Sequence, residues 1–332
     1  MPGIFWIGNP YFSPHLQALG RVVRTHVPST PAPVTWSDIL ALNNGPPDVL
    51  VLGDNSMPPL LLGVERYPCL TAFFCVDSHI HSWHPAYAQA FDLCCLNLKD
   101  NLPAFRQRLQ PEQLLWLPLW AEALEDHPPA QVPEVEKLYD LLFVGNVSPD
   151  IHPGRYAFFQ RLTAAFPGFT VLQGDYHRLF PLARLVFNYA ERGDLNFRVF
   201  QALGTGACLL TSRTGHGQAE LFREGEDLFC YDPEDLNGVL LPVLRRLLDS
   251  PELRARVGRN GLAAVNAGHR APHRAKQFAE WLDSQPAGVL VSRRLEQARG
   301  IYRAWLRLLY LHMAEGLPSP LRERYLEQAR QG

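Results

Sequence analysis

The stretch Gly193-Asp-Leu-Asn-Phe-Arg-Val-Phe-Gln-Ala-Leu-Gly-Thr-Gly-Ala-Cys-Leu-Leu-Thr-Ser212 decides the fold. The apolar run Leu185–Tyr189 before it predicts a buried strand, and a helical pattern starts near Asn196 after a polar loop. Gly204 and Gly206 end that helix, because glycine adopts left-handed backbone conformations at low cost, and a second apolar run follows at once. A strand, a helix and another strand in this order are typical of a parallel sheet covered by helices.

The start of this helix has the chemistry of an anion site. A helix that follows a parallel strand points its N-terminus, with unpaired N–H groups and partial positive charge, to the ligand side of the sheet. Asn196 and Arg198 add donors suited to a diphosphate, and Gln201 lies one turn on from Arg198, within reach of a ribose hydroxyl. We therefore predict that a phosphorylated ligand binds here.

A second loop with similar properties follows the next predicted strand. It contains Gly215, His216, Gly217 and Gln218 and leads into another helix. Glycine lets the backbone approach a phosphate closely, although such loops also serve only to end helices. Two of them on successive strand–helix units, with an arginine beside the first, favour a ligand site.

Predicted strands and helices alternate along most of the chain. The strands of the first half are Ile4–Gly8, Asp48–Asp54, Leu70–Asp77, Asp92–Leu96 and Leu114–Leu119, and its helices include Pro14–Thr25 with Ser13 as N-cap, Ser37–Leu42 and Pro85–Phe91. The strands of the second half are Tyr139–Asn146, Phe169–Gly174, Leu185–Tyr189, Ala207–Ser212 and Leu228–Tyr231, and its helices are Arg155–Ala165, Asn196–Leu203, Gln218–Phe222, Asp235–Leu248 and Pro251–Ala264. This pattern predicts an α/β protein with two doubly wound parallel-sheet domains that face a cleft.

A linker and a helical tail set the predicted boundaries. Segment Glu122–Val135 is rich in Pro and Glu and lacks apolar periodicity, which indicates a linker. Segment Ser292–Arg330 is helical and rich in arginine. Its apolar side consists of Ile301, Trp305, Leu308 and Leu309. Packing of this side on the domains is favoured over peripheral contact with a membrane surface. The predicted parts are residues 1–135, 136–285 and 286–332.

The totals indicate a globular two-domain protein. The chain has 332 residues, 47% of them hydrophobic and 19% charged, and its net charge of −2 suggests no nucleic-acid partner. No run approaches the roughly 18 apolar residues of a membrane span, and the first residues lack a signal-peptide pattern, so we expect a cytoplasmic protein. Six cysteines without a Cys-x-x-Cys pair predict buried thiols rather than a disulfide framework or a zinc site.

The chain resembles the CgeB-like glycosyltransferases of the spore-maturation type, within the GT-B superfamily. The resemblance covers most of residues 1–283 and is strongest over 139–283. Its matches are Tyr139-Asp-Leu-Leu-Phe-Val-Gly-Asn146, His152-Pro-Gly-Arg155, Asp194-Leu-Asn-Phe-Arg-Val-Phe-Gln-Ala-Leu203, Gln218-Ala-Glu-Leu-Phe222, Pro251-Glu-Leu-Arg254 with Gly258 and Gly261, His269, Arg274, and Asp77-Ser-His-Ile-His-Ser-Trp83 with Tyr87 and Phe91-Asp92. The resemblance implies transfer of a sugar from a nucleotide-sugar, a UDP-sugar in the first place, to a hydroxyl of a glycan or protein. It implies no cofactor besides this co-substrate.

Two positions depart from the family pattern. The family usually has Glu at the position of Gln201, where the carboxylate is taken to bind the donor ribose. Glutamine keeps the length and an acceptor oxygen, with weaker hydrogen bonding than a charged acceptor gives. The paired upstream Glu of many related enzymes is replaced by Gly193, with Asp194 next to it. Both changes remove a carboxylate that the family pattern has at the donor site, so they count against full catalytic activity.

Resemblance and chemistry together assign the donor site. Arg155 and Arg198 would lie at the diphosphate with the loop Gly215–Gln218, and Gln201 would meet the ribose. An ion pair on a helix surface is the alternative for Arg155. The other predicted donor residues are Gly145 and Asn146 at a strand end, Gly174, Asp175, Tyr176 and Asn188 near the base, and Asn196 at the helix start.

Asp77, His79 and His81 follow a predicted strand of the first half and are the candidate catalytic residues. Histidine titrates near neutral pH, so an imidazole or a carboxylate here can deprotonate an acceptor hydroxyl. Asp77 and His79 face the same way if the strand continues. Asp-x-His-x-His also resembles metal-ligand spacing, and capping of a helix by Asp77 is a further alternative. No Asp-x-Asp motif occurs, which favours a metal-independent enzyme with no metal site.

Three other functions compete with sugar transfer. A nucleotide-sugar epimerase or hydrolase would use the same architecture without an acceptor. A catalytically silent nucleotide- or sugar-binding module, acting through protein partners, would explain Gln201 and the missing paired Glu. A dinucleotide oxidoreductase is disfavoured because Asn9-Pro-Tyr-Phe-Ser13, after the first strand, is not a Gly-x-Gly-x-x-Gly turn.

Overall fold

The computed structural model describes residues 2–30, 32–124 and 136–331. It divides into two compact units, Met1–Pro118 with Arg274–Gly332 as unit 1 and Leu119–His273 as unit 2. These boundaries differ from the predicted ones at 135/136 and 285/286. The chain joins unit 2 before the proline-rich segment, because the N–H of Ala121 donates to the carbonyl of His269 and its carbonyl accepts from Ala271. Most of the predicted linker, residues 125–135, lies outside the described residues.

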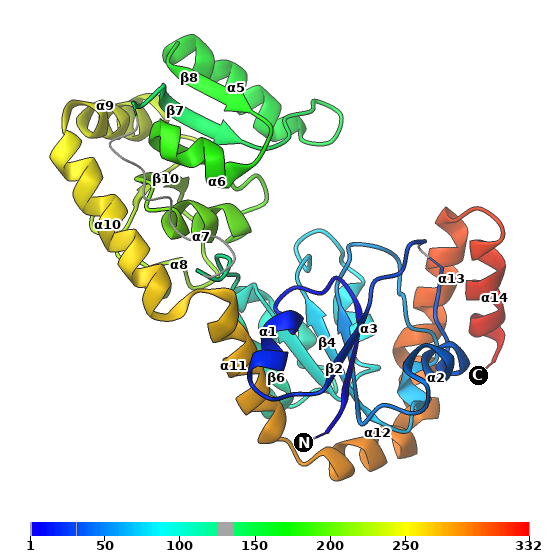
Figure 1. Cartoon of the computed structure of the whole chain (residues 1–332). Coiled ribbons are helices and arrows are strands. Elements are labelled where there is room, and N and C mark those ends of the chain that lie inside the picture. The colour runs from blue at the N-terminus through cyan, green and yellow to red at the C-terminus, as the bar shows by residue number, and fades with distance from the viewer. Residues whose placement is uncertain (1, 31, 125–135, 332) are drawn as a thin grey trace. The chain divides into compact units, whose positions relative to one another are not determined.

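Unit 1 is built on a six-stranded parallel sheet with the order β2-β1-β3-β4-β5-β6. The strands are β1 (Ile4–Gly8), β2 (Val23–His26), β3 (Val49–Gly53), β4 (Leu70–Cys75), β5 (Leu93–Leu96) and β6 (Leu114–Trp116). Its helices are α1 (Ser13–Ala18), α2 (Trp36–Asn43), α3 (His84–Ala88), α4 (Leu102–Phe105), α11 (Ala271–Asp283, which starts in unit 2), α12 (Ala287–Ile301), α13 (Arg307–Gly316) and α14 (Leu321–Arg330). Figure 1 labels most of them. The five strands predicted for this half are confirmed.

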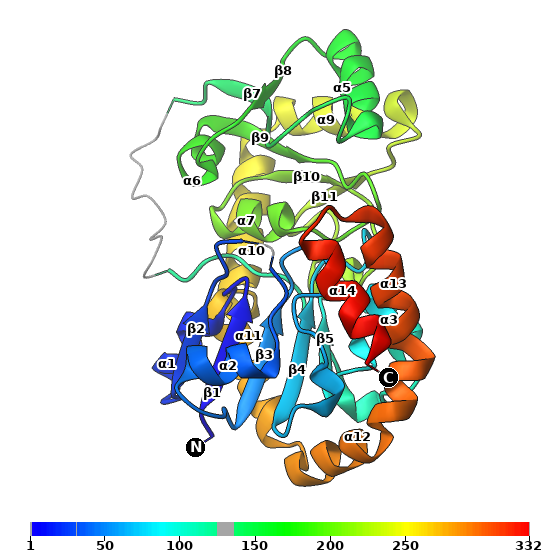
Figure 2. The ribbon, with the colours of Figure 1, turned by 90° about the vertical axis from the view of Figure 1, so that its right-hand side faces the viewer.

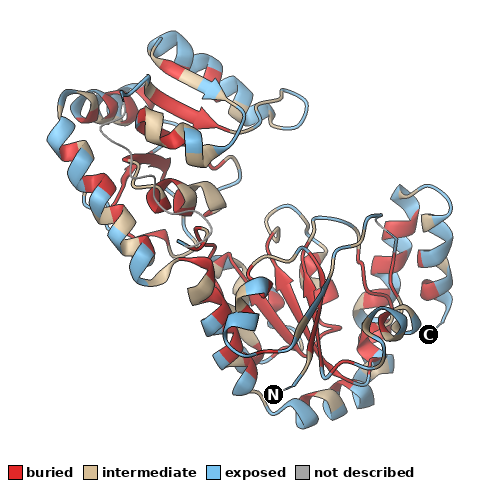
Figure 3. Cartoon of the chain, viewed as in Figure 1, coloured by how far each residue is buried: buried red, intermediate tan, exposed pale blue. Residues whose placement is uncertain are grey.

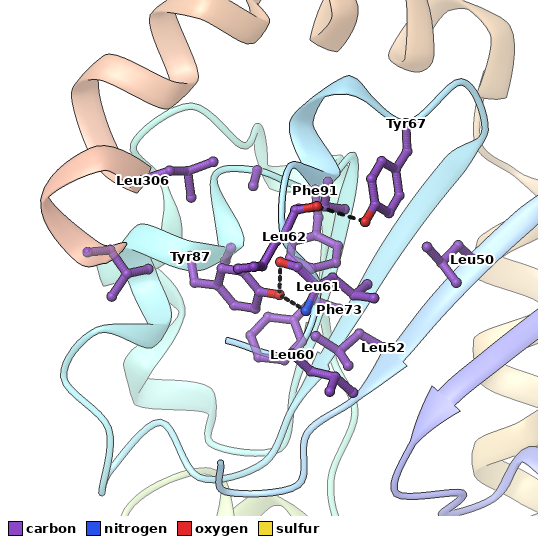
Figure 4. Packing of buried hydrophobic residues seen from close by; sticks show 14 of the residues in the cluster. Leu50, Leu52, Leu60, Leu61, Leu62, Tyr67, Phe73, Tyr87, Phe91 and Leu306 are labelled. Carbon is purple, nitrogen blue, oxygen red and sulfur yellow. Dashed lines mark hydrogen bonds between the residues drawn. The ribbon is translucent and has the colours of Figure 1, made fainter. Parts of the chain in front are cut away.

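Both faces of this sheet are covered, so the central strands β1, β3, β4 and β5 are buried on both sides. On one face Trp6 of β1 packs with Phe12 beside α1 and Phe278 of α11. On the other, Phe73 of β4 packs with residues of α3 and the tail. Figure 3 shows the central strands as buried, and Figure 4 shows Tyr87 in this second core, its hydroxyl bonded to backbone atoms of Leu61. The sheet therefore lies between two helical layers.

The predicted helix Pro14–Thr25 is wrong in its second half. Helix α1 ends at Ala18, and Val23–His26 forms edge strand β2. The chain turns at Gly20, whose φ of +76° favours glycine, and the β-branched residues after it suit a strand. Ser13 is the first residue of the helix rather than its N-cap, and it is buried.

The tail packs on unit 1, so its apolar side belongs to the core. Ile301 and Leu309 are buried with α13 and α14 in the same cluster as β3 and β4. Leu308 was predicted on this side, but it is 68% exposed, because the packed helix presents it to solvent. Among the described residues, none of the helices combines the length and apolar composition that crossing a membrane requires.

Unit 2 is built on a five-stranded parallel sheet with the order β11-β10-β9-β7-β8. The strands are β7 (Tyr139–Val144), β8 (Phe169–Leu172), β9 (Ala183–Asn188), β10 (Leu209–Ser212) and β11 (Phe229–Tyr231). The helices are α5 (Pro153–Ala165), α6 (Tyr176–Leu179), α7 (Phe197–Gly204), α8 (Gln218–Leu221), α9 (Leu241–Asp249) and α10 (Pro251–Gly268). Figure 2 shows α5 and α9 on one face of the sheet and α7 with α10 on the other. All five strands predicted for this half are confirmed.

All six cysteines are buried free thiols, as predicted. Burial raises the pKa of each, most strongly for Cys75, Cys94 and Cys95 in the sheet of unit 1. A thiol with a raised pKa is protonated at neutral pH and is a poor nucleophile. The thiols therefore act as small apolar side chains in the core unless a metal ion binds one of them.

Candidate functional site

The carboxyl edge of the unit 2 sheet has a topological switch point between β7 and β9. Strand β8 lies on one side of β7, and the next strand in the chain, β9, lies on its other side. The connections that follow β7 and β9 therefore lead away from each other. Ligands of doubly wound sheets bind outside this point. Gly145 follows β7, and Asn188 is the last residue of β9.

Arg198, in the first turn of α7, extends to both strand ends. Its Nε donates to the carbonyl of Val144 at 2.9 Å and its Nη1 donates to Oδ1 of Asn188 at 3.0 Å. The guanidinium lies 4.3 Å from the ring centre of Phe143. Burial, and then the charge of Arg155, lower the pKa of Arg198 to about 10, which still leaves the side chain positively charged at neutral pH.

Asn188 was predicted to lie near the base, but its side chain supports Arg198 instead. Asn188 is fully buried. Its Nδ2 donates to Oγ1 of Thr211 at 2.9 Å while its Oδ1 accepts from Arg198. The amide is therefore used for orientation of the arginine, and none of its surface remains for a ligand.

Gly145 makes room for this guanidinium. Its φ is +155°, and a Cβ at this position would lie 2.6 Å from Nη2 of Arg198. A contact that short is closer than carbon and nitrogen atoms can approach. The glycine predicted at the donor site thus has a structural reason in the placement of Arg198.

Arg155, near the start of α5, brings a second cation to the same place. Its Nη1 donates to the carbonyl of Asn146 at 3.0 Å, and its guanidinium lies 5.6 Å from the ring centre of Phe143. Its Nε is buried and, among the described residues, has no hydrogen-bond partner. In the part of the chain that the structure describes, neither Arg155 nor Arg198 forms an ion pair within 4.0 Å of a carboxylate. Two such cations close together favour an anion.

Glu191 was not predicted, although it holds the start of α5. Its Oε1 accepts from the backbone N–H groups of Gly154 at 2.8 Å and Arg155 at 3.1 Å, and its Oε2 lies 3.3 Å from Nδ1 of His152. A carboxylate at a helix N-terminus is stabilising. No motif marks Glu191, because it caps a helix that lies 36 residues earlier in the sequence.

The start of α7 keeps the donors that were predicted from sequence. Asn196 is the N-cap residue, its side chain makes no capping hydrogen bond, and its Oδ1 is buried without a partner among the described residues. Gln201 lies one turn after Arg198 and is half-buried. Asn196, Arg198 and Gln201 thus come from one helix at the carboxyl edge.

The loop after β10 contains the second predicted glycine pair. His216 has a φ of 55° and Gly217 a φ of 83°, so both residues are left-handed. Gln218 was predicted to meet the ligand, but it is buried. Its Nε2 donates to the carbonyl of Ser212 at 3.2 Å and its Oε1 accepts from the N–H of Thr214 at 2.9 Å. Gln218 therefore fixes the loop that carries Gly215 and His216.

Gly174, Asp175 and Tyr176 follow β8, next to β7. Asp175 caps the short α6 by accepting from the N–H of His177 at 2.9 Å. Burial first, and then the neighbouring Glu122, raise the pKa of the Tyr176 hydroxyl. Tyr176 is thus a neutral aromatic side chain beside a carboxylate, which suits contact with a flat, hydrogen-bonding ring.

In unit 1, Asp77, His79 and His81 lie in a turn after β4. The strand ends at Cys75, so these residues do not continue it and the predicted alternation is wrong. The carbonyl of Asp77 accepts from the N–H groups of Ile80 and His81, and its carboxylate accepts from the hydroxyl of Ser56. All three candidates are half-buried, so each can reach solvent.

Sequence reasoning missed Asp54, Cys75 and His84, which lie behind this turn and are buried. Asp54, just after β3, accepts from the N–H groups of Ser56, Val76 and Asp77. His84 begins α3, and burial lowers its pKa to about 4. No spacing rule relates the three residues, because three separate elements bring them together.

The comparisons with known proteins agree with the fold. Residues 141–280 match a family model described as glycosyl transferase-like. A comparison with curated protein sequences finds no match. The structure of Anabaena HepE in complex with UDP and glucose has a TM-score of 0.57 at 12% identity, with 86% of this chain and 100% of that chain covered. Sucrose-phosphate synthase of Thermosynechococcus elongatus has a TM-score of 0.56 at 12% identity, covering 85% and 98%.

A third similar structure is a UDP-forming trehalose-phosphate synthase of Burkholderia vietnamiensis, with a TM-score of 0.55, 13% identity and coverage of 74% and 73%. At these identities the likeness establishes the fold, which is the GT-B fold with two Rossmann-like domains. Together with the family match over unit 2, it indicates a glycosyltransferase. The match covers helices α5 and α7, which carry Arg155 and Arg198.

Proposed function

We propose that the protein transfers a sugar from a nucleotide-sugar to a hydroxyl of a glycan or protein, with a UDP-sugar as the first donor to test. The observation that carries this proposal is the pair Arg155 and Arg198 on the ring of Phe143. Among the described residues neither forms an ion pair within 4.0 Å of a carboxylate, and Glu191 and Asp194 act on Arg155 only at longer range. The family match of unit 2 and the UDP complexes of Anabaena HepE support it.

The two arginines would bind the diphosphate. Arg198 keeps one guanidinium nitrogen, Nη2, without a protein partner among the described residues, and Arg155 keeps its Nε. The N-terminus of α7 adds backbone donors and partial positive charge. These groups would also neutralise the leaving diphosphate, so we propose that transfer needs no metal ion at the phosphates.

The remaining donor contacts follow from position. Gln201, one turn after Arg198, would meet the ribose, and its half-buried amide has no side-chain hydrogen bond within the described residues. Tyr176 would lie against the base, with Glu122 next to it. Gly145 and Gly215–Gly217 would let the phosphates approach the backbone.

On the acceptor side, Asp77 or an imidazole of the turn after β4 would remove the hydroxyl proton. His79→Ala should leave nucleotide affinity unchanged and lower turnover by roughly 10²–10⁴-fold, the usual contribution of a general base. His312→Ala on the exposed face of α13 is the matched control. Full turnover of the His79 variant would assign the base to another residue.

The test of the function is thermal unfolding with nucleoside diphosphates and their sugars, followed by turnover assays. A ligand at about 100 times its Kd adds about 2.7 kcal/mol to the free energy of unfolding. A shift with one nucleotide, and turnover that requires an acceptor, are the expected results. Turnover without an acceptor would indicate a hydrolase or epimerase. Binding without turnover would indicate the silent module that Gln201 suggests, and no shift with any nucleotide would contradict the donor site.

A further inference from the structure

Three buried metal-ligating side chains meet at the carboxyl edge of the unit 1 sheet. Asp54 follows β3, Cys75 ends β4 and His84 begins α3. Sγ of Cys75 lies 3.2 Å from Nδ1 of His84, and Oδ2 of Asp54 lies 3.7 Å from Nε2 of His84. One ligand atom from each residue lies within 4.8 Å of the others. Tetrahedral ligands of zinc, each 2.0–2.3 Å from the ion, are about 3.3–3.8 Å apart. An ion bound by Nε2 of His84 and by Asp54 would therefore require Sγ of Cys75 to leave Nδ1 and move toward the ion.

One polar atom of this cluster, Nε2 of His84, lacks a hydrogen bond among the described residues. The 3.7 Å between Nε2 of His84 and Asp54 is too long for a hydrogen bond, and Nε2 has no partner among the described residues although it is buried. A buried polar atom without a partner costs free energy. A cation beside Asp54 would give this nitrogen the partner that it lacks.

The negative charge of the buried Asp54 carboxylate is not balanced by a lysine or arginine among the described residues. The N–H groups of Val76 and Asp77 donate to Oδ2 and that of Ser56 donates to Oδ1, so the one lone-pair position left of about four is on Oδ1. Within the described residues, no lysine or arginine forms an ion pair with Asp54, although it is only 4% exposed. Buried charges are usually paired or bind metals.

His81 lies beside these three residues, outside the group whose ligand atoms are within 4.8 Å of one another. Its ring centre lies 5.0 Å from that of His84. Its Nε2 is buried and also lacks a hydrogen-bond partner among the described residues. One thiolate, two imidazoles and one carboxylate form a donor set that zinc accepts and that magnesium and calcium do not favour.

We propose that Asp54, Cys75 and His84, with His81 as fourth ligand, bind a transition-metal ion, with zinc as the best fit. This site is separate from the diphosphate chemistry of unit 2. The ion would join the ends of β3 and β4 to the start of α3, and so would fix the turn that carries Asp77 and His79. His81 then serves as a ligand, which leaves those two residues as candidates for the general base.

The experiment uses the full chain. Metal analysis of the purified protein should give about one zinc per chain, and the chelated protein reloaded with Co²⁺ should show a thiolate-to-cobalt charge-transfer band. The matched control is Cys95→Ser, since Cys95 is an equally buried thiol in β5 that lies outside the core cluster containing Cys75. We expect this control to keep the metal and the band, and Cys75→Ser and His84→Gln to lose both.

Two results would overturn the site. One is a wild-type protein that takes up no Co²⁺ with a thiolate band after chelation and reloading, which needs no variant to fold. The other is equal metal uptake by the wild type and the double variant Cys75→Ser/His84→Gln. Thermal unfolding adds a readout independent of activity, because zinc should raise the Tm of the chelated wild type and of Cys95→Ser but not of Cys75→Ser.

Discussion

At the scale of single residues, the candidate donor site depends on how one arginine is held. Arg198 bonds to the carbonyl of Val144 and to Asn188, so its guanidinium is fixed before any ligand arrives. A preorganised cation loses less entropy on binding than a mobile one. This explains why Asn188, which has no surface for a ligand, still matters for the site.

Replacing Arg198 by Ala should weaken binding of the nucleotide by about 1.5–3 kcal/mol, the usual value of a hydrogen bond to a charged group. Calorimetric titration with the nucleotide measures this. Arg161→Ala, an exposed arginine on α5, is the control and should leave the affinity unchanged. Equal affinities of both variants would remove Arg198 from the donor site.

Gly145→Ala should damage the same site by a different route. The new Cβ would lie 2.6 Å from Nη2 of Arg198, and the φ of +155° is strained for alanine, at a cost of roughly 1–3 kcal/mol. Nucleotide affinity should fall together with the free energy of unfolding. The control is Gly225→Ala, at a position with a φ of +80° and no atom within 4 Å of the new Cβ. This control introduces backbone strain without displacing the arginine, so it should lower the free energy of unfolding and leave nucleotide affinity unchanged. Wild-type nucleotide affinity in Gly145→Ala would contradict this explanation.

At the scale of elements, two anchors decide where helices lie. Glu191 caps α5 and so places Arg155, while Arg294 fastens α12 to the sheet of unit 1. Arg294 is fully buried, bonds to Asp92 at 2.9 Å and donates to the carbonyls of Val64, Tyr67 and Cys69. The arginine-rich tail is therefore an internal part of unit 1 at this position.

Arg294→Met should lower the free energy of unfolding by about 3–5 kcal/mol, because it leaves Asp92 charged and buried without its partner. Chemical denaturation measures the change. The adjacent, exposed Arg293→Met is the control and should stay within about 0.5 kcal/mol of wild type. Similar stability of the two variants would show that the tail is not anchored through Arg294.

At the scale of the whole molecule, the donor should stabilise unit 2 more than unit 1. A ligand that binds only the native state reduces opening of the region it contacts. Hydrogen exchange with and without UDP should show the greatest added protection in residues 145–155 and 196–204. The segment 321–330 of α14 is the internal control. Protection that is greatest in α14 would contradict a donor site at Arg198.

The sequence by itself determined the fold class and much of the strand plan. Buried strands of parallel sheets are continuous apolar runs, so Ile4–Gly8 and Tyr139–Val144 can be recognised from composition alone. The start of α7 could also be recognised, because a polar loop before a helix is a local pattern. The edge strand Val23–His26 was missed, since it is half-buried and lacks this apolar signature.

Only the tertiary structure decided which polar side chains are used internally. Asn188 and Gln218 were predicted to face a ligand, yet both are buried and hold neighbouring groups. Glu191 and the cluster of Asp54, Cys75 and His84 left no trace in the sequence. Their partners lie on other elements, and a side chain's hydrogen bonds depend on which strand ends the sheet brings together, an arrangement that local spacing does not encode.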